Sequence, residues 1–101
     1  MAMYFALHTQ KQDPKKFADF FGANAAHYAT TMAAGKSAAK CIKTWNPMAS
    51  GRNDYVFCLW EAEQPADIDA TLHEFGLDAY LTADIMKVDE IDWAQLAKMK
   101  T

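Results

Sequence analysis

The chain has 101 residues, of which 51% are hydrophobic and 23% are charged, and its formal net charge is −3. This length suits one domain spanning residues 1–101, and the composition is that of a globular protein. The acidic balance argues against nucleic-acid binding through phosphates. The chain has no apolar run of about 18 residues and no basic region followed by an apolar core. We therefore expect no membrane partner, and a cytoplasmic location.

Charge is spread unevenly along the chain. Residues 1–52 carry a net charge of +5, and residues 53–101 carry −8. Either the two halves interleave in the fold, or their charges complement each other across a dimer interface. The two cysteines, Cys41 and Cys58, have neither CxxC nor zinc-finger spacing, so we expect free thiols in the core.

The first half of the chain predicts a strand followed by a long helix. Residues 3–9 have strand character. Asp13 is a favourable N-cap and Pro14 suits the first helical position. Apolar and aromatic residues then recur at helical spacing until Gly35, which is a natural end. The predicted helix has about 21 residues.

The remaining elements are separated by turn residues and by residues that typically start or end a helix. A strand over 39–45 and a strand over 55–62 flank turn residues at 46–54. Pro65 opens a second helix that Gly76 ends, and residues 81–89 predict a fourth strand. Asp92, three residues before Gln95, predicts a short C-terminal helix.

The element order is therefore β-α-β-β-α-β, which is the ferredoxin-like order of an α+β fold. Right-handed crossovers place both long helices on one face of a four-stranded antiparallel sheet. The first and third strands then lie at its centre.

Both faces of the two central strands are apolar. In residues 3–9 the two faces carry Met3, Phe5 and Leu7, and Tyr4, Ala6 and His8. Two helices on one side bury only one face, and soluble monomers rarely expose a large apolar patch. Burying one such side chain is worth about 1.5–3 kcal/mol. We therefore expect a homodimer packed through the sheet face, as in a dimeric α+β barrel.

The third strand and its continuation carry a family resemblance. Phe-Cys-Leu-aromatic-Glu-Ala ends this strand at residues 57–62, and a Pro-started helix and a glycine follow. The chain resembles the dimeric α+β barrel superfamily, which includes cofactor-free monooxygenases of antibiotic biosynthesis and muconolactone isomerases. Residues 39–92 are similar to a small bacterial family with some nickel-binding members. The long first helix departs from that family.

The resemblance implies a cleft between sheet and helices that orients a small aromatic or apolar ligand without a cofactor. The candidate ligand-binding residues are Asn24, Tyr28, Trp60 and Trp45. The candidate catalytic bases are His27 and His8, whose ordinary pKa suits proton abstraction near neutral pH. Alternatively, these aromatic residues are core and interface anchors, and the histidines serve packing.

A metal site is the second interpretation. Imidazole suits nickel and zinc. His8 and His27 would have to converge with a carboxylate such as Asp84 or Glu61, because no two histidines have i,i+3 or i,i+4 spacing. We assign no metal ligand from the sequence.

Three functions remain open. The chain is a small-molecule-binding protein or cofactor-free monooxygenase- or isomerase-like enzyme, a nickel- or other transition-metal-binding stress protein, or a non-catalytic dimeric interaction module. The sequence favours the first, with the pocket between the sheet and the first helix.

Overall fold

The computed structural model describes residues 1–99, so the last two residues of the expected domain lie outside it. Helices and strands follow the predicted order, with a C-terminal helix after the fourth strand. They are β1 (Ala2–Thr9), α1 (Pro14–Ala33), β2 (Lys40–Trp45), β3 (Tyr55–Ala62), α2 (Pro65–Glu74), β4 (Asp84–Lys87) and α3 (Trp93–Met99). The short 3-10 turns η1 (Pro47–Ser50) and η2 (Leu77–Ala79) were not predicted. The α+β, ferredoxin-like order is confirmed.

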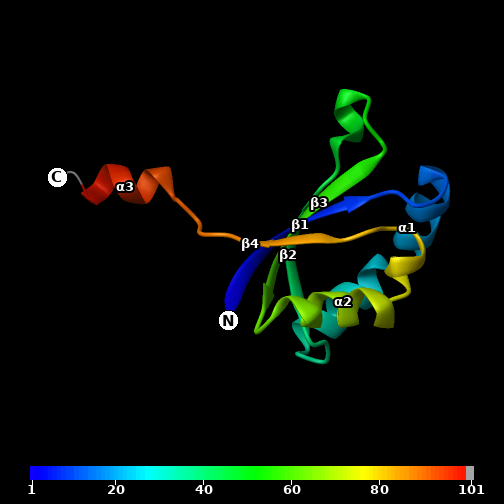
Figure 1. The fold of residues 1–101 in the computed structure, drawn as a ribbon, viewed down its shortest axis with the longest axis horizontal. Coiled ribbons are helices and arrows are strands. Elements are labelled where there is room, and N and C mark those ends of the chain that lie inside the picture. The colour runs from blue at the N-terminus through cyan, green and yellow to red at the C-terminus, as the bar shows by residue number, and fades with distance from the viewer. Residues whose placement is uncertain (100–101) are drawn as a thin grey trace.

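The four strands form one sheet in the order β2-β3-β1-β4. Every neighbouring pair is antiparallel, and the predicted central strands β1 and β3 lie side by side. Helices α1 and α2 lie on the same side of this sheet (Figure 1). No helix within residues 1–99 is long and apolar enough to cross a membrane.

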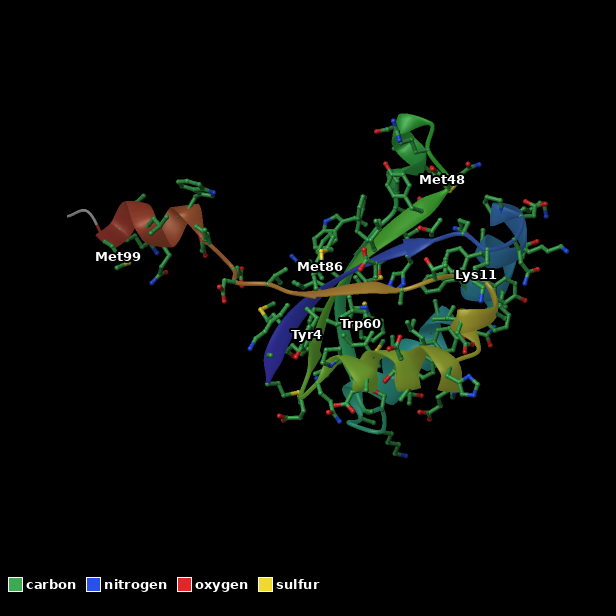
Figure 2. The ribbon with its side chains drawn as sticks, viewed as in Figure 1. Tyr4, Lys11, Met48, Trp60, Met86 and Met99 are labelled. Carbon is green, nitrogen blue, oxygen red and sulfur yellow. The ribbon has the colours of Figure 1, made fainter. Side chains whose placement is uncertain are left out.

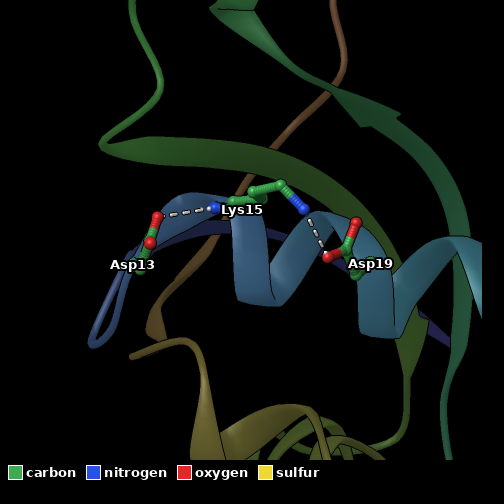
Figure 3. A network of polar contacts seen from close by, with 3 residues as sticks. All are labelled: Asp13, Lys15 and Asp19. Atoms are coloured by element: carbon green, nitrogen blue, oxygen red, sulfur yellow. Dashed lines mark hydrogen bonds and ion pairs between the residues drawn. The ribbon is translucent and has the colours of Figure 1, made fainter.

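The capping residues predicted from the sequence are found at both ends of α1. The Asp13 carboxylate accepts a hydrogen bond from the Lys15 amide at 3.0 Å, and the Lys15 ammonium contacts Asp19 at 3.0 Å (Figure 3). At the other end, Gly35 has a φ of 71°, which favours glycine. The amide of Lys36 then donates to the Thr31 carbonyl at 3.1 Å and closes the helix.

Burial alternates along the central strands. In β3, Val56, Cys58 and Trp60 are buried beneath the helices, whereas the residues between them are half-buried on the open face. Tyr4 and Ala6 of β1 are buried on the same side as these residues. Figure 2 shows Tyr4 and Trp60 on the helical side of the sheet and Met86 on the other. The open face carries the remaining apolar residues: Met3, Phe5, Leu7, Tyr55, Phe57, Leu59, Trp45 and Met86.

A β-bulge in β2 changes the side of the sheet to which the side chains after it point. Cys41 pairs with Trp60, but Lys43 pairs with Leu59, so the register shifts between them. An extra residue in one strand inverts the alternation of side chains beyond it. Cys41 and Thr44 therefore both face the helices, and Trp45 faces the open side.

The fourth strand is shorter than predicted. The sequence indicated residues 81–89, but β4 covers Asp84–Lys87. Leu81 forms only an isolated bridge with Gln10 and is buried in the core. Residues before Asp84 that have strand character therefore pack against the core and do not extend the hydrogen-bonded pairing of β4 with β1.

Candidate functional site

A cavity of about 290 Å³ lies between the sheet and the two helices. Its size is close to the lower end of the range of about 300–1,000 Å³ found for small-molecule sites. Its walls are mostly apolar and come from β1, α1, β2, β3, α2 and η2, with Phe17, Phe21, Ala29, Met32, Leu72 and Leu77 among them. The few polar groups along its walls therefore decide what it binds.

His8 of β1 is the main polar group of the cavity wall, and it is fully buried. Its Nδ1 lies 2.9 Å from the Thr82 carbonyl oxygen. A carbonyl only accepts hydrogen bonds, so Nδ1 carries the proton and Nε2 presents a lone pair. Nε2 is buried and has no hydrogen-bond partner in the structure. Burial lowers the pKa of His8, and the Thr82 carbonyl and the charge of Asp69 offset this only in part. The ring is therefore neutral near pH 7.

The backbone around Thr82 is fixed to β1 next to His8. The Thr82 amide donates to the Thr9 carbonyl at 2.9 Å, and the Thr9 amide donates to the Thr82 hydroxyl at 2.9 Å. These two bonds hold the Thr82 carbonyl in place, and that carbonyl sets the tautomer of His8. The sequence pointed to His8 but gave no signal for Thr82, because the two residues are 74 positions apart.

Trp60 lines the same cavity from β3 and is 3% exposed. Its indole N–H is buried and has no acceptor in the structure. Buried donors are nearly always satisfied in folded proteins. The cavity wall thus holds two residues with an unsatisfied polar atom, one a donor and one an acceptor.

Two thiols and a hydroxyl form a small polar cluster on the β2–β3 side of the cavity. Thr44 Oγ1 lies 3.5 Å from Cys41 Sγ and 3.3 Å from Cys58 Sγ. The hydrogen bond from the Cys58 thiol lowers the pKa of Cys41. Hydrogen bonding to Cys41, together with burial, raises the pKa of Cys58. Both cysteines are free, as expected; Cys58 is buried and Cys41 is half-buried.

Tyr28 also lines the cavity, but its hydroxyl is already committed. It donates to the Phe75 carbonyl at 2.7 Å, and the two rings stack with centroids 4.3 Å apart. Burial raises the pKa of Tyr28. This side chain therefore joins α1 to α2 and supplies an aromatic wall.

Asn24 and His27 do not reach this cavity. They line a second hollow on the outer side of Tyr28, with Phe20 and Glu74. The Asn24 side-chain amide donates to the Phe20 carbonyl of its own helix at 2.8 Å, and His27 is exposed. The single pocket expected for Asn24, His27, Tyr28 and Trp60 is thus divided in two. On a helix, neighbouring residues point about 100° apart, so His27 turns outward where Tyr28 turns inward.

Trp45 lies on the far face of the sheet. It is 46% exposed, and its ring centroid is 6.3 Å from that of Phe5. The bulge in β2 accounts for this position, because a regular strand would have put Trp45 on the same side as Cys41.

The proposed convergence of His8 and His27 on a metal ion is not found. Among residues 1–99 no group of three or more histidine, cysteine or carboxylate side chains is placed to hold a metal ion. His8 is enclosed by the sheet and helices, whereas His27 faces solvent on α1.

Comparisons with known proteins give one structural similarity. No protein-family model matches the chain, and no curated protein matches it. Among solved structures, it is similar to SnoaB, a cofactor-independent oxygenase from Streptomyces nogalater. The identity is 13%, the match covers 90% of this chain and 93% of SnoaB, and the TM-score is 0.49. The fold assignment itself follows from the element order and strand pairing of this chain.

Proposed function

We propose that the protein binds a small, largely apolar molecule in the cavity beside His8, and that His8 acts on it as a base. The observation that carries this proposal is the buried, unpaired Nε2 of His8, whose tautomer is fixed by the Thr82 carbonyl. A buried acceptor without a partner is costly unless a ligand supplies one. The ligand therefore carries an acidic hydrogen, such as a phenolic O–H or a C–H next to a carbonyl.

The lowered pKa of His8 supports this role. A neutral imidazole at pH 7 is ready to accept a proton, and the Thr82 carbonyl hydrogen-bonds the N–H of the imidazolium that results. The ligand becomes an anion at the same moment, so the cation and anion form as a pair inside the apolar cavity.

The Trp60 indole N–H is the complementary group. It is a donor without an acceptor, and it lines the same cavity. A hydrogen bond from a neutral donor to an anion is stronger than one to a neutral oxygen. Trp60 therefore stabilises the deprotonated ligand more than the protonated one, which favours proton abstraction.

The reaction class that follows is proton abstraction without a bound cofactor. Return of the proton to a different carbon of the anion is an isomerisation. Reaction of the anion with molecular oxygen is an oxygenation. The residues support the first step, which both outcomes share.

A pair of probes tests the site. We expect 1-naphthol, which carries a phenolic O–H, to bind more tightly than naphthalene by about two- to tenfold, since one hydrogen bond is worth about 0.5–1.5 kcal/mol. Binding is measured by quenching of tryptophan fluorescence. His8→Phe keeps an aromatic ring and removes the acceptor, so it should abolish the preference. His73→Phe, on the exposed part of α2, is the matched control.

Trp60→Phe provides a second variant that keeps the cavity wall and removes only the N–H donor. It should shift the pKa of bound 1-naphthol upward relative to wild type. An unchanged preference for 1-naphthol in His8→Phe would overturn the assignment of His8. Failure of both probes to bind wild type would overturn the cavity as a ligand site.

We also propose that the protein acts as a homodimer through its open sheet face. The face is aromatic and apolar: the Phe5 and Phe57 ring centroids are 5.7 Å apart, and Trp45 and Met86 are 46% and 44% exposed. A second copy presents the same surface, so a two-fold axis lets each copy cover the other. Sedimentation should show a dimer at micromolar concentration, and a monomer would refute this assembly.

A further inference from the structure

The C-terminal segment, residues 88–99, extends away from the body of the protein; we call it the C-terminal arm. Figure 1 shows α3 well beyond the end of β4 and apart from α1 and α2. The described chain measures 50 × 34 × 23 Å, and its radius of gyration is 14.9 Å. A compact chain of this length has a radius of about 13 Å. The arm accounts for the excess.

The arm is apolar where a solvated helix should be polar. Ile91, Trp93, Leu96 and Met99 are 65%, 78%, 42% and 74% exposed, and no residue of α3 is buried. Trp93, Leu96 and Met99 recur at three-residue spacing, so they lie near one another on the helix.

The helix is nonetheless well started. The Asp92 carboxylate accepts hydrogen bonds from the amides of Ala94 and Gln95, at 3.0 and 3.3 Å. An isolated helix of seven residues is unstable in water, because nucleation is unfavourable and few bonds follow. A capped helix with an apolar stripe therefore indicates a surface that it packs against.

We propose that this surface is β2 of a second copy of the chain, so that two copies exchange their C-terminal arms. Sheet topology supports this choice. The edges of the sheet are β2 and β4. If two open faces stack about a two-fold axis parallel to the strands, β4 of one copy lies over β2 of the other.

The strand register places the start of the arm near the start of that β2. The Val88 amide donates to the Met3 carbonyl, so β4 ends where β1 begins. Met3 is paired with Glu61, and Glu61 is paired with Lys40. The end of β4 and the start of β2 thus lie at the same end of the sheet. A two-fold axis parallel to the strands keeps them together.

Charge complements this arrangement. The arm begins with Asp89, Glu90 and Asp92, whereas β2 carries Lys40 and Lys43. Both lysines are exposed, and by register both face the open side. Three carboxylates of one copy therefore meet two ammonium groups of the other, beside the 40% exposed Ile42.

The arm would also border the ligand cavity of the second copy. Ile42, which would lie beside the arm, is on β2 and also lines that cavity. This consequence rests on the proposed ligand site, whereas the arm exchange itself rests on the proposed dimer through the open sheet face.

Photocross-linking tests the exchange independently of any ligand. Trp93 is replaced by p-benzoylphenylalanine, and equal amounts of isotope-labelled and unlabelled chain are mixed and refolded. We expect cross-linked peptides that join residue 93 of one isotope to residues 40–45 of the other. The matched control places the same group at Met48, which is 57% exposed at the opposite end of the sheet. It should give no cross-link to residue 40.

A second measurement separates arm exchange from sheet packing. Trp93→Ser combined with Leu96→Ser should raise the dimer dissociation constant by at least about a hundredfold, because four apolar side chains leave each dimer interface. Met48→Ser should leave it unchanged. Cross-links confined to like isotopes would overturn the exchange in favour of an arm folded on its own sheet. So would an unchanged dissociation constant in the double variant, even if the dimer itself persists.

Discussion

The buried His8 predicts how stability depends on pH. Burial lowers the pKa of this imidazole from its ordinary value of 6.5. The unfolded chain takes up a proton on His8 near pH 6.5, whereas the folded chain does so only at lower pH. Between these two pH values the unfolded state binds more protons, so the free energy of unfolding falls as pH falls. The contribution is fully present above about pH 6.5.

The size of the effect follows from linkage. One proton changes the free energy of unfolding by at most about 1.4 kcal/mol for each pH unit. A small domain has about 5–15 kcal/mol of stability in total. With a urea dependence of about 1–3 kcal/mol per molar, the loss per pH unit moves the midpoint by at most about 0.5–1.4 M.

Urea unfolding followed by circular dichroism between about pH 7.5 and about pH 5 measures this effect, a range above that of most carboxylates. His8→Phe removes the group and should flatten the dependence. The exposed His73 serves as the control site, because His73→Phe removes a histidine that is not buried. A wild-type midpoint that stays constant over this range would refute the inference that His8 is held neutral by burial. An equal slope in His8→Phe would assign the dependence to another group.

Two further substitutions test the packing around the cavity by urea unfolding. Tyr28→Phe leaves the Phe75 carbonyl without its 2.7 Å donor and should lower the free energy of unfolding by about 1–3 kcal/mol. Tyr55→Phe, at a half-buried ring, is the control and should lower it by less than about 0.5 kcal/mol. Equal losses in the two variants would contradict the structural role of the Tyr28 hydroxyl. Gly76→Ala should lower the free energy of unfolding by about 1–2 kcal/mol, because Gly76 has a φ of 76° and a Cβ there would lie 3.3 Å from the Phe20 ring. An unchanged free energy of unfolding would show that the turn after α2 accommodates a side chain.

The sequence specified the element order through local signals. Asp13, Pro14 and Gly35 bound the first helix as predicted, because capping and positive φ depend on residues within one turn. Strand periodicity also determined which residues of β1 and of β3 share a face. These features depend on near neighbours, so the sequence determines them.

Tertiary contacts decided what the sequence did not. The bulge in β2 moved the Trp45 side chain to the other side of the sheet. No local sequence signal predicts where an extra residue enters a strand pairing. Likewise, the rotation of α1 about its axis put Tyr28 inside and left His27 in solvent. Each of these outcomes depends on how an element packs against residues remote in the chain.

The candidate base shows both contributions. Strand alternation alone placed His8 on the same face as Tyr4 and Ala6, and the fold buries that face. Its tautomer, its unpaired Nε2 and its lowered pKa come from Thr82 and from burial beneath the helices. Periodicity decides which way a side chain points, because it is a property of the backbone. The partner that a side chain meets depends on where the chain returns, and only the assembled sheet and helices decide that.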